Sequence, residues 1–221
     1  MGGIQQVRLS RIVDRLHFEA DDAVVVEEPL SIRIARTTEG LRDEATLAVT
    51  MRTPGQDEEL ALGFAFNEGV IQRRADVHSV RRAGPRIPQT GSHNEIVLEL
   101  AAEVAVNWTE LHRHSEVSSS CGVCGKTLID ARRHRFHPAQ TSGLFSRESI
   151  LAWSETAFAT QTLFHATGGI HAVALFHANG ALQGVREDVG RHNALDKLTG
   201  AFLETVPWRE HALFLSGRVS F

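Results

Sequence analysis

A strand, a hairpin turn, a return strand and a helix follow one another in residues 170–203, which read IHAVALFHANGALQGVREDVGRHNALDKLTGAFL. Residues 170–176 are a compact apolar run, Asn179-Gly180 is a hairpin-turn dipeptide, and residues 181–186 supply the return strand. A polar turn that contains a glycine leads into helical patterning over residues 191–203. This arrangement predicts an α/β domain.

The rest of the chain also alternates between strand-like and helix-like patterns. Strands are expected at residues 23–35, 47–52, 95–100 and 211–215, and helical patterns at 127–135 and 146–165. Pro29 divides the first of these into two short strands or one broken edge strand, and a helix after the turn at 53–59 is expected to end at Gly69. Residues 84–92 are expected to form a loop. Regular patterning lapses near residues 107–115, which predicts an N-terminal lobe over 1–110 and a second domain over 111–221.

Composition excludes several function classes. The 221 residues are 42% hydrophobic and carry a formal net charge of −4, so no overall basic field favours nucleic acid or an acidic membrane as a partner. No apolar run approaches the roughly 18 residues of a membrane-spanning helix, and the N-terminus lacks the apolar centre of a signal peptide. We therefore expect a soluble protein of the reducing cytoplasm.

Residues 118–126 read SSSCGVCGK and hold the two cysteines of the chain, Cys121 and Cys124. The small flanking residues indicate an accessible loop, and a following helix start together with Lys126 would favour thiolate over thiol. A structural disulfide is disfavoured, because a loop of two residues restricts the unfolded chain very little. A zinc site would need two further ligands. Redox or sulfur-carrying chemistry is the third interpretation.

Three glycine-bearing turns are candidate anion sites, since backbone N–H groups at a strand-to-helix turn bind phosphate. The candidate binding residues in and beside these turns are Gly168, Gly169, His171, Arg186, Gly190, Arg191, His192, Asn193, Ser216, Gly217 and Arg218. A structural explanation competes with this one. The turn before residue 191 could simply cap a surface helix, with Arg186 paired to Glu187 or Asp188, and His171 could be an ordinary structural histidine.

Four segments of the chain together resemble the signature segments of the FdhD/NarQ family. They are residues 52–60 (RTPGQDEEL), 118–126, 166–171 (ATGGIH) and 186–197 (REDVGRHNALDK). They occur in the family's order, and the resemblance extends over nearly the whole chain from about Glu27 onward. Members of this family are accessory sulfurtransferases needed for active molybdenum-dependent formate dehydrogenase.

The resemblance implies a cytidine-deaminase-like α/β domain with a smaller N-terminal lobe, working as a homodimer. Separately, we expect no bound zinc, because the two thiolates have no evident second pair of ligands. The resemblance also implies that Cys121, with Cys124 as its partner, accepts sulfane sulfur from a cysteine desulfurase of the IscS type as a persulfide. The sulfur then passes to the bis(guanylyl) molybdopterin cofactor before its insertion into formate dehydrogenase. The glycine turns would hold the guanine nucleotide ends of that cofactor, which GDP would mimic. Family members continue beyond the position of Phe221, so we expect this chain to be C-terminally truncated and its cofactor site to be incomplete.

Two other functions use the same residues differently. Zinc nucleobase deaminases carry H-x-E followed by P-C-x-x-C, and His93, Glu95, Cys121 and Cys124 match this pattern superficially. Ser120 replaces the proline, however, and Glu95 is expected to enter a strand rather than a helix start. A non-enzymatic chaperone for the cofactor or the apoenzyme is the other alternative, and it should tolerate loss of the cysteines.

Overall fold

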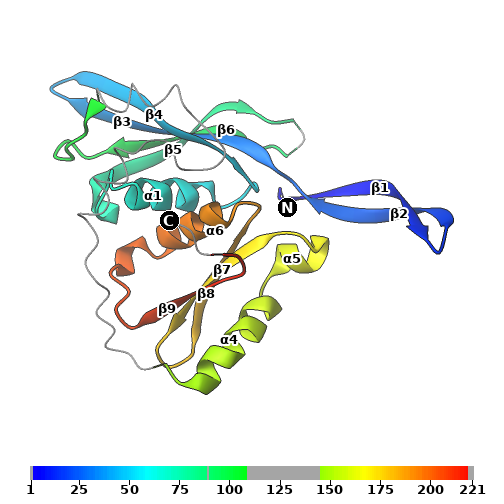
Figure 1. The fold of residues 1–221 in the computed structure, drawn as a ribbon. Helices are drawn as coiled ribbons and strands as arrows, with labels where there is room; N and C mark the ends of the chain where they lie inside the picture. Colours follow the sequence, from blue (N-terminus) through cyan, green and yellow to red (C-terminus); the bar gives the residue numbers. More distant parts are fainter. Residues whose placement is uncertain (1, 89, 109–144, 219–221) are drawn as a thin grey trace.

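The computed structural model describes residues 2–88, 90–108 and 145–218, which form a mixed α/β structure dominated by strands (Figure 1). Three sheets are present in these residues, with strand orders β1-β2, β4-β3-β6-β5 and β8-β7-β9. The strands are β1 (Ile4–Val13), β2 (Leu16–Val25), β3 (Glu28–Thr38), β4 (Leu41–Arg52), β5 (Val77–Arg86), β6 (His93–Leu100), β7 (His171–His177), β8 (Leu182–Asp188) and β9 (His211–Leu215). The α-helices are α1 (Asp57–Asn67), α4 (Arg147–Ala159), α5 (Thr162–Thr167) and α6 (Arg191–Ala201).

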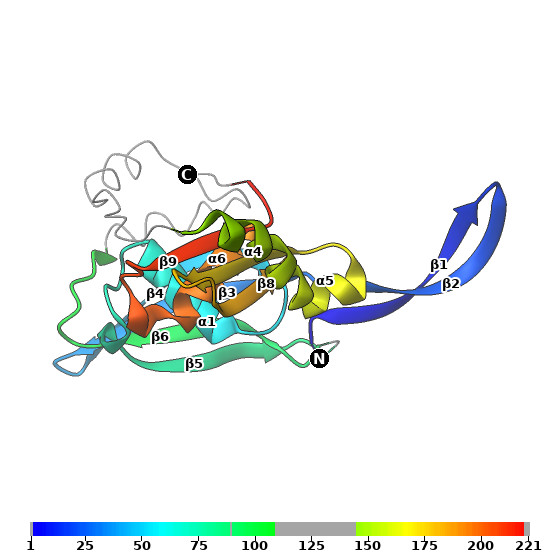
Figure 2. The same ribbon diagram turned by 90° about the horizontal axis from the view of Figure 1, so that it is seen from below.

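The elements are stacked in layers. Figure 1 shows the four-stranded sheet, then α1, then α6, then the three-stranded sheet, with α4 on the far face of that sheet. The hairpin of β1 and β2 projects from this body (Figures 1 and 2). No helix in the described part of the chain is long and apolar enough to cross a membrane.

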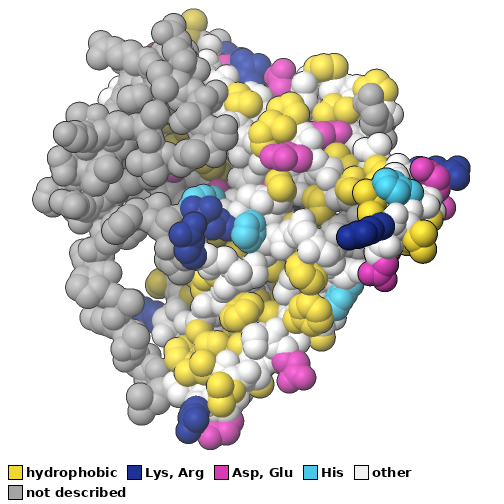
Figure 3. Space-filling model, turned by 45° about the vertical axis from the view of Figure 1, so that its right-hand side comes forward, with side chains coloured by type: hydrophobic (Ala, Val, Ile, Leu, Met, Phe, Trp, Pro, Cys, Tyr) yellow, Lys and Arg dark blue, Asp and Glu magenta, His cyan; other side chains and the backbone are white. Residues whose placement is uncertain are grey.

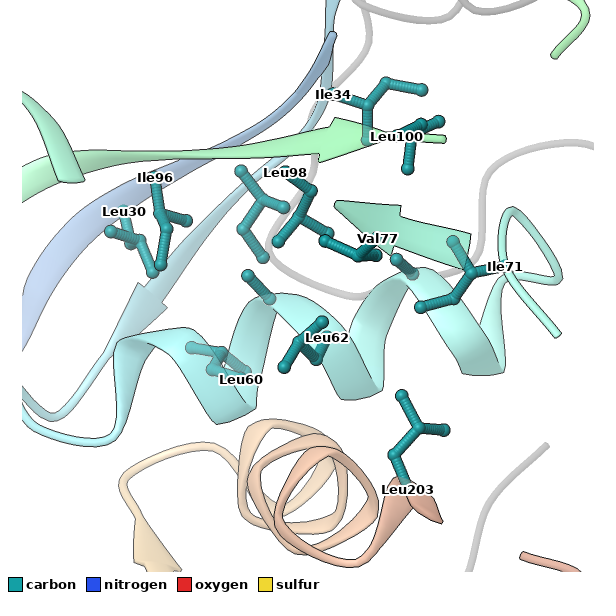
Figure 4. Packing of buried hydrophobic residues seen from close by; sticks show 13 residues of the cluster. Leu30, Ile34, Leu60, Leu62, Ile71, Val77, Ile96, Leu98, Leu100 and Leu203 are labelled. Atoms are coloured by element: carbon teal, nitrogen blue, oxygen red, sulfur yellow. The ribbon is translucent and has the colours of Figure 1, made fainter. Parts of the chain in front are cut away.

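The largest hydrophobic core lies between the four-stranded sheet and α1. Figure 4 shows Leu30, Ile96 and Leu98 of the sheet pointing toward α1, the helix that contributes Leu60 and Leu62 to the same core. Every one of these five side chains is buried, and burying a side chain of this size contributes about 1.5 to 3 kcal/mol. This core fixes the orientation of α1, and α1 in turn supports α6.

Strand β7 explains the compact apolar run in the sequence. Its residues Ala174 and Phe176 pack with Trp153 of α4 on one face, whereas Val173 and Leu175 pack against α6 on the other. A strand covered on both faces has no solvent side, so its sequence does not alternate. The indole ring of Trp153 stacks on Phe176 with ring centroids 5.1 Å apart.

Helices α1 and α6 approach each other through glycine. A Cβ atom on Gly63 would overlap the carbonyl oxygen of Asp196, and one on Gly200 would overlap the carbonyl oxygen of Glu59. Two helix backbones can come this close only where side chains are missing. The close approach places the polar residues of α6 deep inside the molecule.

Most of the expected strands and helices are confirmed, with corrections at their ends. Residues 23–35 are not two short strands or one edge strand: β2 ends at Val25 and β3 continues to Thr38 as an internal strand. Pro29 is tolerated because pairing with β6 starts two residues later, at Ser31. The helical pattern at 146–165 is divided into α4 and α5, and part of the expected loop at 84–92 belongs to β5. The expected helix at 127–135 lies outside the described residues.

The buried carboxyl group of Asp196 lies at the contact between α1 and α6. Its Oδ1 accepts a hydrogen bond of 2.7 Å from the side-chain amide of Asn67. The pKa of Asp196 is raised from 3.8 to about 7, chiefly by burial and also by the charges of Glu68 and Asp188, against the lowering effect of the Asn67 hydrogen bond. The folded protein therefore retains a proton that the unfolded chain releases near pH 3.8.

We predict that this carboxyl group makes the protein less stable as the pH rises. Its contribution is greatest below the unfolded pKa and is lost as the pH rises through about 7. Relative to Asp196→Asn, the wild type should lose roughly 2 to 3 kcal/mol of unfolding free energy between about pH 5 and about pH 8. Urea unfolding of both proteins at the two pH values measures this. The same pH dependence in both proteins would contradict the assignment.

Candidate functional site

Three turns meet at one edge of the three-stranded sheet. Strand β7 is antiparallel to β8 and β9. The start of β7 therefore lies beside the residues that come directly after the ends of β8 and β9. Ser216 pairs with Ala172, whose N–H donates to the Ser216 hydroxyl oxygen at 2.9 Å. A Cβ atom on Gly217 would lie 3.2 Å from His171 Nδ1 and 3.7 Å from Arg191 Cδ. The sheet thus brings His171, Arg191 and Gly217 into contact.

The turn between β8 and α6 is held by the buried carboxylate of Asp188. Its Oδ2 accepts from the backbone N–H of Thr53 at 3.1 Å and from Lys197 Nζ at 2.8 Å. Its Oδ1 accepts from the N–H of Gly190 at 2.9 Å and from the Asn193 amide at 3.1 Å. Four donors from three parts of the chain therefore fix this one side chain.

Lys197 completes the same network. The ammonium group is fully buried and also donates to the carbonyl oxygen of Thr53 at 2.8 Å. The hydroxyl oxygen of Thr53 accepts in turn from the N–H of Val189 at 3.1 Å. Because the Lys197 ammonium group pairs with Asp188, it holds the turn in shape from inside the protein. A buried lysine of this kind is a positioning group, because its charge is already balanced.

The preceding residue, Glu187, fixes the other side of the edge. Its carboxylate accepts from the backbone N–H groups of Leu163 at 3.0 Å and Phe164 at 2.8 Å, at the start of α5. Negative charge at a helix N-terminus satisfies N–H groups that have no partner inside the helix. Adjacent residues of β8 therefore secure α5 and the α6 turn separately.

A groove of about 660 Å³ lies between α4, α5 and this sheet edge. Its lining consists of Ser154, Phe158, Gln161, Phe164, Gly169, Ile170, His171, Val189, Phe214 and Ser216. Figure 3 shows Lys or Arg side chains next to His side chains on one face, with hydrophobic side chains close by. The groove combines aromatic rings with an imidazole and borders the turn that carries Arg191, so it could accept a planar ring attached to an anionic group.

Two of the other predicted binding residues, Arg186 and Asn193, form bonds with distant parts of the chain. Arg186 forms an ion pair with Glu59 of α1, with Nη2 to Oε1 at 2.8 Å, rather than with Glu187 or Asp188 as the structural explanation supposed. Asn193 is buried and donates to the carbonyl oxygen of Met51 at 2.7 Å. Both side chains are therefore bonded to partners of their own chain.

Four further candidates lie at or near the surface of the edge. Gly168 ends α5 with a φ of 73°, a conformation that suits glycine, and Gly169 lines the groove. Arg218 is exposed. His192 is also exposed, and partial burial and the neighbouring Arg191 charge lower its pKa.

Cys121 and Cys124 lie outside the described residues. The other residues of the deaminase pattern are described: Glu95 lies in β6 and pairs with Arg33 at 3.3 Å, and His93 Nδ1 contacts the Gly84 carbonyl oxygen at 3.0 Å. Glu95 thus enters a strand, as expected. Within the part of the chain that the structure describes, no three His, Cys, Asp or Glu side chains are grouped closely enough to hold a metal ion.

The chain belongs to the FdhD/NarQ family, whose sequence model matches residues 25–221. It is 43% identical to a sulfur carrier protein FdhD of Mycolicibacterium paratuberculosis, over 90% of this chain and 72% of that protein. A protein of the same name from Streptomyces coelicolor is 39% identical over 100% of this chain and 78% of its own length. The archaeal counterpart from Sulfolobus acidocaldarius is 36% identical over 99% and 78%.

A solved structure supports the fold. The crystal structure of a formate dehydrogenase accessory protein from Desulfotalea psychrophila superposes with a TM-score of 0.68 and covers 97% of this chain and 75% of that one. The two sequences are 22% identical. The arrangement of sheets and helices described above is therefore shared with that protein.

We predict that Asp188 and Lys197 are energetically coupled. Lys197→Met leaves a buried carboxylate without a cation, and Asp188→Asn leaves a buried ammonium group without an anion, so each should cost about 3 to 5 kcal/mol. The double variant removes both charges and should cost clearly less than the sum of the two single changes. Urea unfolding of the four proteins gives the coupling energy.

The ion pair of Arg73 and Asp76 provides the control, because the substituted side chain, Arg73, is 79% exposed. Arg73→Met should change stability by less than about 1 kcal/mol. Simple additivity of the Asp188 and Lys197 substitutions would show that the two groups act independently.

Proposed function

We propose that this protein carries sulfane sulfur as a persulfide on Cys121. The observation that carries the proposal is its membership of a family whose curated relatives are named sulfur carrier proteins, combined with a C-x-x-C pair set among small residues. The Cys121 thiolate attacks the outer sulfur of a donor persulfide, a new S–S bond forms, and the donor cysteine leaves as a thiolate. The sulfur is transferred without any external oxidant or reductant.

The donor in this proposal is a cysteine desulfurase of the IscS type, and the recipient is the molybdenum cofactor, bis(guanylyl) molybdopterin, on its way to formate dehydrogenase. Cys124 would resolve the persulfide or assist its release. The protein would act as a homodimer in the cytoplasm, with a domain of the cytidine-deaminase-like type carrying the cysteines. The relatives' names support the sulfur-carrying step and the accessory role for formate dehydrogenase.

The sheet edge is the proposed site for a guanine nucleotide end of that substrate. Arg191 and His171 both lie next to Gly217 and would bind phosphate, and the first turn of α6 presents the positive end of its helix dipole there. The purine ring would enter the adjoining groove and pack beside the contacting rings of Phe158 and Phe164. The network around Asp188 supports this proposal, because it holds the turn in one shape before any ligand arrives.

We predict that Cys121→Ala abolishes sulfur loading and maturation of formate dehydrogenase, because the persulfide-forming thiolate is missing. Cys124→Ala should retain part of the loading. After incubation with a desulfurase and cysteine, mass spectrometry should show about 32 Da added per sulfur on the wild type. Full loading of the Cys121 variant would overturn the assignment, and maturation without either cysteine would identify a chaperone instead.

A second prediction concerns the nucleotide site. Arg191→Ala should weaken GDP binding by roughly 1.5 to 3 kcal/mol, the contribution of a hydrogen bond to a charged group, while sulfur loading on Cys121 stays unchanged. Arg209→Ala is the matched control, because Arg209 is exposed and lies in the loop before β9. Calorimetric titration of GDP into the wild type and the two variants measures the three affinities. Equal GDP affinity for the wild type and Arg191→Ala would show that the turn simply caps α6.

A further inference from the structure

The turn that joins α4 to α5 contributes a polar side chain to an aromatic part of the groove (Figure 1). Gln161 lies three positions after Phe158 and three positions before Phe164, and all three residues line the groove. The rings of Phe158 and Phe164 contact each other edge to face, with their centroids 5.6 Å apart. The carboxamide of Gln161 therefore belongs to the part of the groove in which we place the purine ring.

The backbone of Gln161 is hydrogen-bonded, whereas its side chain is not. The Gln161 N–H donates to the Phe158 carbonyl oxygen at 3.1 Å, and the Gln161 carbonyl oxygen accepts from the His165 N–H at 3.0 Å. The residue is 5% exposed, yet its carboxamide bonds to none of the residues that the structure describes. Buried polar side chains are nearly always hydrogen-bonded, so this exception needs an explanation.

Helix capping does not provide that explanation. Gln161 occupies the position before α5, where a side chain often accepts from the backbone N–H groups of the first turn. Its side chain makes no such bond. The carboxylate of Glu187 already accepts from the N–H groups of Leu163 and Phe164. The carboxamide of Gln161 is thus available to a group that enters the groove.

A carboxamide places an acceptor oxygen beside N–H donors. The edge of guanine that carries O6 and N1–H presents an acceptor beside a donor, so the two edges are complementary. Among the described lining residues, the other polar side chains are Ser154, His171 and Ser216, and none is acidic. His171 and Ser216 belong to the sheet edge at which we place phosphate. Gln161 is therefore the lining side chain best suited to bond the edge of the base.

We propose that Gln161 recognises the base, with Nε2–H donating to guanine O6 and Oε1 accepting from guanine N1–H. This inference rests on the proposed nucleotide site and names the residue that reads the base within it. The same groove is lined by Gln161 and by His171 of the sheet edge, so one ligand can reach both. The two bonds form only when the base arrives, because the carboxamide has no partner among the described residues beforehand.

The first test separates stability from binding. Gln161→Met replaces an unbonded buried amide with an apolar side chain of similar size, so its urea midpoint should equal or exceed that of the wild type. Its GDP affinity should fall roughly 10-fold or more, because two hydrogen bonds to the base are lost. Gln183→Met is the matched control. Gln183 is exposed on β8 and donates to the Ala181 carbonyl oxygen, so this variant should match the wild type in both measurements.

The second test identifies the edge of the base that is read. Inosine diphosphate lacks only the N2 amine of GDP. At pH 8 the carboxylate of Gln161→Glu accepts from both N1–H and N2–H, so this variant should raise the preference for GDP over inosine diphosphate at least about 10-fold relative to the wild type. A side chain that acts only through the fold would weaken both nucleotides equally. Adenine is uninformative, because a rotated amide could bond its N6 and N1 as well.

Calorimetric titration of the wild type and each variant with both nucleotides measures the affinities, and circular dichroism shows that each is folded. Arg191→Ala separates two kinds of failure, because it should weaken both nucleotides equally and leave their ratio unchanged. If Arg191→Ala weakens GDP but the two Gln161 variants keep the wild-type affinity and ratio, the nucleotide site stands and the role of Gln161 is overturned. If the wild type binds no GDP, the proposed nucleotide site and this inference are both overturned.

Discussion

The buried carboxylate of Asp188 joins separate segments of the chain around the end of the three-stranded sheet. It accepts hydrogen bonds from the loop before α1, from its own turn and from two side chains of α6. A carboxylate can be buried in this way only when its charge is balanced, and Lys197 supplies that balance from inside the protein. The close backbone contact of α1 and α6 at Gly63 and Gly200 makes this arrangement possible, since it brings both helices under the same loop.

Glu187 and Asp188 together explain how one strand end can organise the sheet edge that we propose as a binding site. Glu187 holds the start of α5, which forms a wall of the groove, and Asp188 holds the turn that carries Arg191. Both carboxylates are used internally, so the charge that faces the groove comes from the basic and imidazole groups at the edge. The separation of structural acids from surface bases suits an anionic ligand with a flat ring.

The sequence predicted the α/β class, the hairpin at Asn179-Gly180 and the helix after the polar turn, because local turn chemistry and periodicity determine these elements. It did not predict β1, β2 or β5, whose apolar residues are interrupted by charges that are tolerated on exposed faces. At the site, glycine spacing predicted the three turns, and the structure brings His171, Arg191 and Gly217 together. The internal roles of Arg186 and Asn193 were not predictable, because their partners Glu59 and Met51 are more than 100 residues away. In the sequence Lys197 looked like a surface cation, whereas in the folded protein it is fully buried.

The central claim is that the edge held by Asp188 binds the guanine nucleotide part of the substrate, and a crystal structure of the protein with GDP tests it most directly. The account predicts phosphate oxygens within hydrogen-bonding distance of the Arg191 guanidinium group and the first turn of α6, beside Gly217, with the purine ring in the groove between α4 and α5. Nucleotide bound elsewhere on the protein, with this edge unoccupied, would contradict it.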